Sequence, residues 1–243
     1  MELGRLVFEH PDFILVDKPA NVSVHRDQSE QGFLMALSQA RQEPLWLVHR
    51  LDKMTSGLLL IGRNQQAASE LSALFADRKV DKLYLAVSTA KPRRKQGMIT
   101  GDMQSARRGS WKLVRSQKNP ARTEFISRSL GEGMRLFLCH PLTGKTHQIR
   151  VALKSEGSPI LGDSRYASQQ DRIADRGYLH AWQLGFEFRS QKFSFRADPA
   201  LGVWFEKARS QGDLEALLSE NLPPHWQLTY LPVASDSVAQ EIL

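Results

Sequence analysis

The stretch LVHRLDKMTSGLLLIGRN, residues 47–64, sets four polar side chains directly before an apolar run. His49, Arg50, Asp52 and Lys53 fall within five residues, and Thr55-Ser56-Gly57 separates them from the run. The run predicts a largely buried strand after a turn. Burial tends to neutralise a carboxylate, whereas a nearby cation keeps it ionised. An ionised carboxylate held in place can act as nucleophile or base, so Asp52 is the first candidate for chemistry.

The composition restricts the class of protein. The chain has 243 residues, of which 41% are hydrophobic and 24% charged, as in one large globular domain or two small ones. No apolar run reaches the roughly 18 residues of a membrane span, and the first residues do not resemble a signal peptide. We therefore expect a cytoplasmic protein without a membrane partner. The single cysteine, Cys139, excludes an internal disulfide and is predicted to be a buried structural thiol.

Positive charge is concentrated in one segment, residues 91–122, which we call the basic segment. The whole chain carries 33 Lys and Arg against 26 Asp and Glu, a net charge of +7. Within the basic segment the only acidic residue is Asp102. A solvated face normally mixes both signs, so this segment is predicted to face the phosphates of a nucleic acid. Its basic residues are Lys91, Arg93, Arg94, Lys95, Arg107, Arg108, Lys112, Arg115, Lys118 and Arg122.

The remaining pattern predicts many strands and few helices. Strands are expected at 12–19, 57–63, 82–88, 121–129 and 134–140, a closing hairpin at 184–197 joined by Gln191, and a hairpin or long loop at 91–120. Helices are expected at 32–42, at 65–79 after the cap Asn64, and at 147–156 after the cap Thr146. Because strands and helices do not alternate regularly, we predict an α+β fold with a mixed, mainly antiparallel sheet. We predict one domain over 1–219 and a C-terminal tail over 220–243.

The loop PLTGKTHQ, residues 141–148, resembles a phosphate-binding P-loop because Gly144-Lys145-Thr146 lies between a strand and a helix. The full P-loop needs a glycine five places before Gly144, where this chain has Cys139, so the loop cannot wrap a polyphosphate. The seven histidines show no metal-binding spacing, and no Gly-x-Gly-x-x-Gly occurs. We therefore expect chemistry by side chains alone, without a cofactor or a metal.

Five stretches resemble, in order, the motifs of the RluA-type pseudouridine synthases. They are ILVDKPANVSVH at 14–25, HRLDKMTSGLLLIGR at 49–63, KLYLAV at 82–87, PLTGKTHQIRVALKSEGSPILGDSRYA at 141–167 and LHA at 179–181. The resemblance implies the pseudouridine synthase fold, with residues 1–219 as the catalytic domain. It implies an isomerase that breaks the bond between ribose C1′ and uracil N1 in RNA and rejoins the base through C5, a reaction that needs no cofactor.

The resemblance also implies roles for particular residues. Asp52 becomes the catalytic carboxylate, Tyr84 stacks on the uracil and removes a proton, and Arg150 pairs with Asp52 by a charge-assisted hydrogen bond. Arg50 fills the space that a flipped uridine leaves. The other substrate-binding residues that it implies are His49, Thr55, Lys145, His147, Gln148 and Leu179.

Three positions depart from the usual pattern of the family. Lys145 replaces Arg, Ala152 replaces His and Asn21 replaces Gly. Lysine contacts phosphate as a point charge without the fork of arginine, so these departures bear on the RNA that is recognised and not on the reaction.

The first motif begins by residue 14, so we expect no N-terminal S4 RNA-binding domain. The affinity for tRNA or ribosomal RNA must then come from the catalytic domain. We expect the basic segment to form part of the surface that contacts RNA, with Arg93, Arg94, Arg107 and Arg108 among the contacts. No obligatory protein partner is inferred. The alternative is a non-catalytic RNA-binding protein or RNA chaperone that retains the synthase fold, and the intact set of Asp52, Tyr84 and Arg150 favours the enzyme.

Overall fold

The computed structural model describes residues 2–25, 32–220 and 226. Within this part, the chain forms two compact units. The first unit comprises residues 2–25, 32–81 and 180–198, and the second comprises residues 82–179, 199–220 and 226. The chain passes between the units inside strands β5 (Val80–Ser88) and β10 (Leu179–Phe188), and again after Asp198. None of the helices described is long and apolar enough to cross a membrane.

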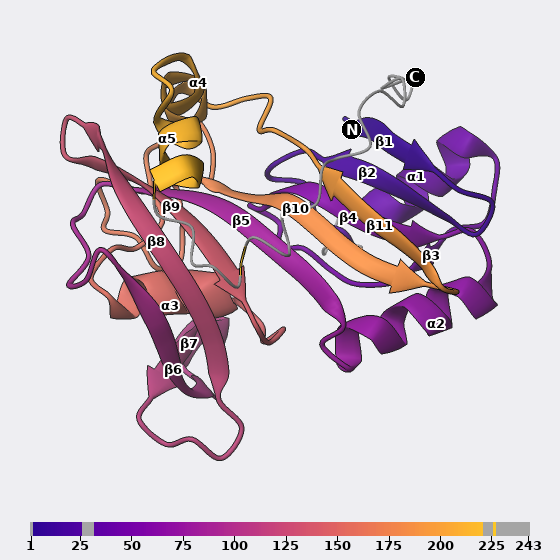
Figure 1. Ribbon diagram of the computed structural model, residues 1–243, viewed down its shortest axis with the longest axis horizontal. Helices are drawn as coiled ribbons and strands as arrows, with labels where there is room; N and C mark the ends of the chain where they lie inside the picture. Colours follow the sequence, from indigo (N-terminus) through magenta and orange to yellow (C-terminus); the bar gives the residue numbers. More distant parts are fainter. Residues whose placement is uncertain (1, 26–31, 221–225, 227–243) are drawn as a thin grey trace. The chain divides into compact units, whose positions relative to one another are not determined.

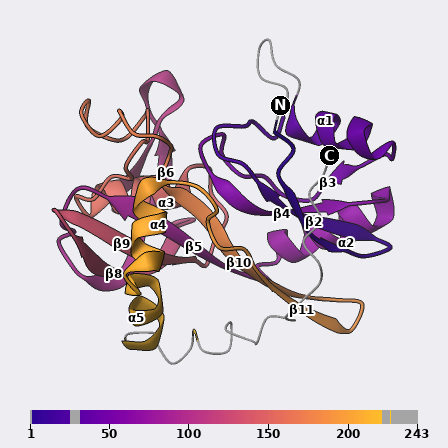
Figure 2. The ribbon, with the colours of Figure 1, turned by 90° about the horizontal axis from the view of Figure 1, so that it is seen from above.

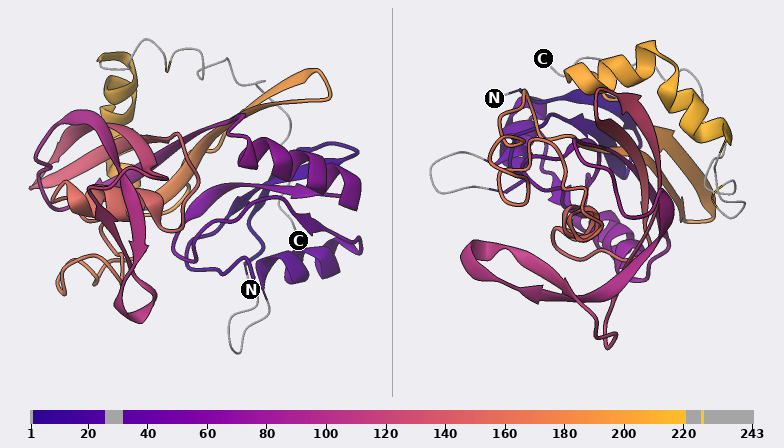
Figure 3. Two further views of the ribbon diagram at one scale, coloured as in Figure 1. Left: turned by 90° about the horizontal axis from the view of Figure 1, so that it is seen from below. Right: turned by 90° about the vertical axis from the view of Figure 1, so that its left-hand side faces the viewer.

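The first unit is a mixed sheet with a helix on each side. Its strand order is β1-β2-β4-β10-β11, and the short β3 pairs with β4. β4 and β10 run parallel, while the other pairs in this sheet are antiparallel. The left view of Figure 3 shows α1 and α2 on opposite sides of the strands. The bounds are β1 Arg5–Glu9, β2 Phe13–Lys18, α1 Phe33–Arg41, β3 Trp46–Leu47, β4 Ser56–Gly62, α2 Gln65–Ala76 and β11 Gln191–Arg196.

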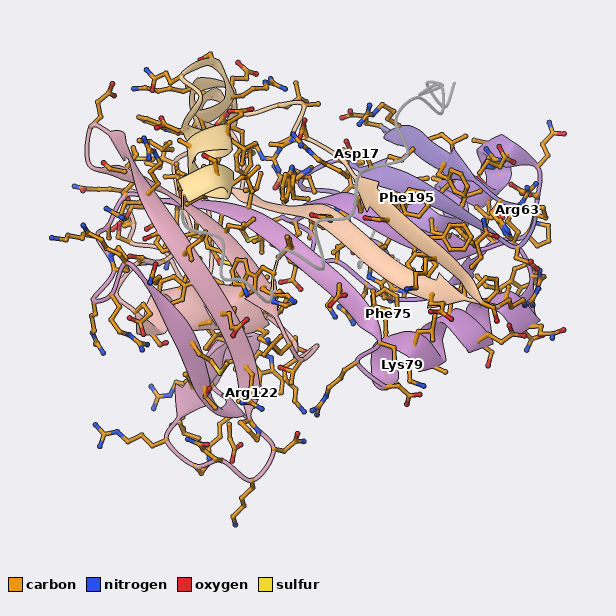
Figure 4. All side chains as sticks on the ribbon, viewed as in Figure 1. Asp17, Arg63, Phe75, Lys79, Arg122 and Phe195 are labelled. Carbon is orange, nitrogen blue, oxygen red and sulfur yellow. The ribbon has the colours of Figure 1, made fainter. Side chains whose placement is uncertain are left out.

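The apolar runs of the sequence explain why β4 is buried on both faces. All seven of its residues are buried. Leu58 and Leu60 pack with α2 and with aromatic side chains of β10 and β11, including Phe195, which is labelled in Figure 4. Such complete burial gives β4 a rigid start, directly after the loop that carries Asp52.

The second unit is built on an antiparallel sheet in the order β5-β9-β8-β6-β7. α3 packs against β7, β8 and β9, and α5 packs against β8. In Figure 1 the β6–β7 hairpin forms the lower edge of this unit, and Figure 2 shows α4 and α5 following one another. The bounds are β6 Gln96–Ser105, β7 Trp111–Val114, β8 Ala121–Gly131, β9 Met134–Pro141, α3 Gln148–Ser155, α4 Val203–Ser210 and α5 Asp213–Glu220.

This architecture confirms the predicted α+β fold with a mixed, mainly antiparallel sheet. The expected strands and helices are present, and the basic segment forms a hairpin, β6–β7. Four of the strands and α-helices were not predicted, namely β1, β3, α4 and α5. The predicted tail lies outside the described residues, apart from Glu220 at the end of α5 and the isolated Trp226.

Two local predictions are wrong. Thr146 does not cap α3, because the N-cap is His147 in the left-handed region at φ 56°. Gln191 does not form the turn of the closing hairpin, because it already pairs with Phe188. The turn is Arg189-Ser190, with φ of 48° and 64°, and two residues of positive φ match the twist of a two-residue hairpin.

We predict that Asn64→Ala lowers the free energy of unfolding by about 1 kcal/mol. The Asn64 Oδ1 accepts a hydrogen bond from the Ala67 amide at 2.8 Å, which satisfies one of the free donors at the start of α2. Urea unfolding measures the loss. The control is Gln65→Ala at the neighbouring exposed position, and equal changes in both variants would contradict the cap.

Candidate active site

Asp52 lies in the loop between β3 and β4, and apolar neighbours anchor this loop. Leu51 and Met54 are buried, and the Thr55 amide donates to the Asp52 carbonyl at 2.9 Å. Asp52 itself is half-buried and Arg50 is exposed. The loop therefore fixes the backbone at Asp52 and leaves its carboxylate partly open to solvent, as chemistry on an external substrate requires.

His49 attaches the same loop to the sheet. Its Nε2 accepts a hydrogen bond from the Leu60 amide at 3.0 Å, and its ring stacks on Phe75 of α2 with centroids 4.3 Å apart. Figure 4 labels Phe75. A nitrogen that accepts an amide hydrogen carries no proton. These contacts give His49 a structural role, and its contact with substrate stays a prediction.

The first residues of β4 are fixed by β10. Ser56 Oγ lies 2.7 Å from His180 Nδ1, and His180 Nε2 lies 2.7 Å from the Ala197 carbonyl. A carbonyl can only accept, so Nε2 carries a proton and donates to Ala197. Gly57 has φ 103°, and a Cβ there would lie 2.3 Å from the Ala181 carbonyl. The quoted motifs TSG and LHA contain these residues, but their contact was not foreseen.

Tyr84 projects from β5 in the second unit. It is half-buried and pairs across the sheet with Cys139 of β9. Cys139 is fully buried, and this burial raises the pKa of its thiol far above the usual range. The prediction of a structural thiol is thereby confirmed. The catalytic role of Tyr84 stays a prediction.

Arg150 forms a buried ion pair with Asp163. Its Nε and Nη2 donate to the two carboxylate oxygens at 2.7 and 2.9 Å, and the two side chains are 7% and 0% exposed. Asp163 also accepts from the Arg165 and Tyr166 amides at 2.9 and 3.1 Å. This pair was not predicted, although the motif GDSRY contains Asp163. The pair uses two of the five guanidinium N–H groups.

Gln148 holds the loop before α3 against β8. Its Oε1 accepts from Thr143 Oγ1 at 2.6 Å and from the Lys145 amide at 3.0 Å. Its Nε2 donates to the Arg122 carbonyl at 3.0 Å and to Thr123 Oγ1 at 2.9 Å. Figure 4 labels Arg122 on β8. All four hydrogen-bonding positions of the buried amide are thus used within the protein, which indicates a structural role.

The other predicted residues lie on both units. Lys145 Nζ donates to Asn119 Oδ1 at 2.9 Å, and Leu179 and Thr55 are buried. His49, Arg50, Asp52 and Thr55 belong to one loop of the first unit, whereas Tyr84, Lys145, His147, Gln148, Arg150 and Leu179 belong to the second. Asp52 and Arg150 thus belong to different units, and their pairing stays a prediction.

The basic segment presents exposed arginines. We call β6, β7 and the turn Arg107–Gly109 between them the basic hairpin. Arg93, Arg107 and Arg108 are exposed. Arg94 is exposed as well, but its guanidinium donates to Glu156 at 2.5 Å, and this bond raises the pKa of Arg94. Part of its charge is therefore neutralised inside the protein, which the sequence did not indicate.

The Asp102 carboxylate is hydrogen-bonded within the loop that follows β7. It accepts from Ser116 Oγ at 2.7 Å and from the Lys118 and Asn119 amides at 3.0 and 2.9 Å. The bond from Ser116, with those from the two amides, holds the pKa of Asp102 below its usual value. The loop that carries Lys118 is thereby ordered by the only acidic residue of the basic segment.

We predict that Asp163→Asn lowers the free energy of unfolding by about 3 kcal/mol, because it leaves the buried Arg150 charge without its carboxylate. Urea unfolding measures the loss. In the control, Asp171→Asn, the side chain accepts one exposed bond from Ser168, so a change below about 0.5 kcal/mol is expected. A similarly small loss at Asp163 would contradict the structural importance of the pair.

Comparisons with known proteins agree with this arrangement. The sequence model of the family described as RNA pseudouridylate synthase matches residues 12–155. An uncharacterized RNA pseudouridine synthase of Haemophilus influenzae is 49% identical over 84% of this chain and 91% of its own length. Ribosomal large subunit pseudouridine synthase D of Nitrosomonas europaea is 34% identical over 74% of this chain and 57% of its own length.

Ribosomal large subunit pseudouridine synthase C of Vibrio parahaemolyticus is 30% identical over 76% of this chain and 62% of its own length. Among solved structures, human RNA pseudouridylate synthase domain containing 1 has the same fold, with a TM-score of 0.71 at 24% identity over 90% of this chain and 96% of that one. The matched region contains the Asp52 loop, Tyr84, the basic segment and α3. The chain belongs to the RNA pseudouridylate synthase family, in its RluA-type branch.

Proposed function

We propose that this enzyme converts specific uridines of tRNA or ribosomal RNA to pseudouridine with Asp52 as the catalytic carboxylate. One observation carries the proposal: Asp52 is a half-buried carboxylate on a loop whose neighbours Leu51 and Met54 are buried. The loop leads directly into the fully buried β4. A reactive group must be held in place, and a buried strand holds its neighbours more firmly than a free loop does.

The reaction keeps every atom of the nucleotide except for exchanged protons. The bond between C1′ and N1 breaks, the uracil turns, and a bond forms between C1′ and C5. The proton on C5 then leaves, and N1 gains a proton. In our proposal Asp52 attacks the nucleotide or drives formation of a sugar intermediate, and Tyr84 stacks on the uracil and takes part in removal of the C5 proton.

We assign Arg150 the role of keeping Asp52 charged and oriented. Its bonds to Asp163 use Nε and Nη2. They fix the plane of the guanidinium, so the directions of its other N–H groups are fixed as well. An N–H group with a fixed direction loses little entropy when it donates to a carboxylate, which supports Arg150 as the partner of Asp52 in the active enzyme.

Arg50 is proposed to occupy the space of the flipped uridine. A uridine inside folded RNA must leave its stack before a carboxylate can reach C1′. Arg50 is exposed and lies two residues before Asp52, so a nucleotide that reaches Asp52 also comes within reach of Arg50. The guanidinium is planar and can stack where the base has left.

Of tRNA and ribosomal RNA, we favour ribosomal RNA as the substrate. Two relatives at 30% and 34% identity are ribosomal large subunit pseudouridine synthases C and D. The net charge of +7 and the exposed arginines of the basic segment suit any folded RNA, so they support binding without choosing between the classes.

We predict that Asp52→Asn and Asp52→Ala form no pseudouridine on unmodified tRNA and ribosomal RNA transcripts. The RNA dissociation constant should stay within about twofold of the parent value, since binding relies on phosphate contacts. Transcripts that carry tritium at uracil C5 release it when C5 loses its proton, which provides the measurement. The control is Asp77→Asn, an exposed carboxylate next to the end of α2.

Two outcomes would count against the proposal. Tritium release by Asp52→Asn at the parent rate would exclude Asp52 as the catalytic carboxylate. A parent protein that binds RNA and releases no tritium from any transcript would favour the non-catalytic RNA-binding protein. Pseudouridine mapping in cells with and without the gene identifies the modified uridine.

We further predict that the triple variant Arg93→Gln, Arg107→Gln and Arg108→Gln binds RNA at least about tenfold more weakly. The slope of log affinity against log salt should fall by about 0.9 for each phosphate contact that is lost. The control removes three exposed charges elsewhere, by Lys79→Gln, Lys192→Gln and Arg209→Gln. Both variants lose the same net charge, so equal weakening would point to the total charge and not to the basic segment.

A further inference from the structure

We propose that Tyr166 is a positioning residue that transmits RNA binding on the basic hairpin to Arg150. The inference rests on the proposed function, because it takes the basic hairpin as an RNA contact and Arg150 as the partner of Asp52. Tyr166 lies in the loop between α3 and β10 and is 5% exposed. No role was assigned to it from the sequence.

The Tyr166 hydroxyl bridges the basic hairpin and α3. It accepts a hydrogen bond from the amide of Trp111, the first residue of β7, at 2.8 Å. It lies 2.8 Å from Nδ1 of His147, the N-cap of α3. Since one lone pair accepts the Trp111 amide, the single hydroxyl proton is available for His147. One oxygen atom thus joins the start of β7 to the start of α3.

The same tyrosine also contacts the surroundings of Arg150. The Arg150 guanidinium carbon lies 5.0 Å from the centre of the Tyr166 ring. The Tyr166 amide donates to Asp163, the carboxylate that holds Arg150. Arg150 follows His147 by three residues, which is about one helical turn. A displacement of β7 is therefore transmitted to Arg150 by Tyr166, whose hydroxyl contacts β7 and whose ring and amide contact Arg150 and Asp163.

The chain that leads into the basic hairpin is attached at the other end of α3. The Arg93 amide donates to the Glu156 carbonyl at 2.9 Å, and the Arg94 side chain donates to the Glu156 carboxylate. This attachment holds the chain that enters β6, whereas Tyr166 holds the first residue of β7. Arg107 and Arg108 lie in the turn directly before β7. Phosphates that bind these two arginines therefore displace β7, the strand that is hydrogen-bonded to Tyr166.

Tyr178 offers a matched comparison inside the second unit. Its hydroxyl donates to Asp175 Oδ1 at 2.6 Å and lies 3.2 Å from the Trp204 amide. Like Tyr166, it is a buried tyrosine whose hydroxyl joins a backbone amide to a side chain. Its partners belong to the loop before β10 and to α4, away from the basic hairpin. Loss of the Tyr178 hydroxyl therefore reports the cost of breaking such a bridge without touching β7.

The experiment compares Tyr166→Phe with Tyr178→Phe in single-turnover tritium release at saturating RNA. Tyr166→Phe keeps the ring and removes the bridge, so we expect the rate constant to fall about tenfold. Tyr178→Phe should change it by less than about twofold. Urea unfolding of both variants shows whether their losses of stability are comparable.

A double-mutant cycle then separates transmission from a purely structural effect. In the variant that carries Arg107→Gln and Arg108→Gln, phosphates no longer bind the turn and displace β7. There Tyr166→Phe should lower the rate constant of tritium release by less than about twofold. His147→Gly removes the other partner of the same hydroxyl at a φ that glycine adopts freely, and should show the same dependence on the background.

Two results would overturn the inference while the proposed function stands. One is a parent-like rate for Tyr166→Phe, and the other is the same fold-loss in both backgrounds. Failure of the parent enzyme to release tritium would refute the proposed function itself, and the inference with it. The parent rate therefore distinguishes the two failures.

Discussion

The buried ion pair between Arg150 and Asp163 is the constraint on which the second unit depends. Two charges taken out of water cost several kcal/mol each unless every donor and acceptor is satisfied. Asp163 meets this demand by accepting four hydrogen bonds, two from Arg150 and two from the amides of Arg165 and Tyr166. Those amides reach the carboxylate because the loop after α3 turns at Asp163, whose carbonyl accepts from the Ala167 amide. The hydrogen bonds that satisfy one carboxylate thus also hold this turn of the backbone.

The first unit uses a chain of hydrogen bonds in place of an ion pair. A serine, a histidine and a backbone carbonyl form this chain, which links Ser56, His180 and Ala197. A glycine beside them lets β4 and β10 approach more closely than a side chain allows. In each unit, a buried polar network includes or adjoins a residue to which a catalytic role is assigned. Ser56 follows the loop of Asp52, and Arg150 is itself a member of the ion pair. Rigidity at the candidate site therefore comes from satisfied polar groups as much as from apolar packing.

The sequence predicted what depends on nearby residues. Apolar runs identified β2, β4, β5, β8 and β9, and Asn64 was recognised as a cap because its partner is three residues away. Contacts between distant residues were not readable: Ser56 and His180 are 124 positions apart, and Arg94 and Glu156 are 62 apart. Thr146 was a reasonable cap by residue type, but the chain enters α3 through a left-handed residue, a backbone choice that tertiary contacts impose.

The burial of Cys139 has a practical consequence for chemistry on the surface of this enzyme. It is the one cysteine of the chain, and its raised pKa keeps it as a thiol, whereas alkylating reagents attack the thiolate. Maleimide or spin-label reagents should therefore not react with Cys139. Cysteines introduced in pairs, one in each unit, would be the only labelled positions, with no need to replace the native thiol. The enzyme is thus ready for spectroscopic distance measurements with and without bound RNA.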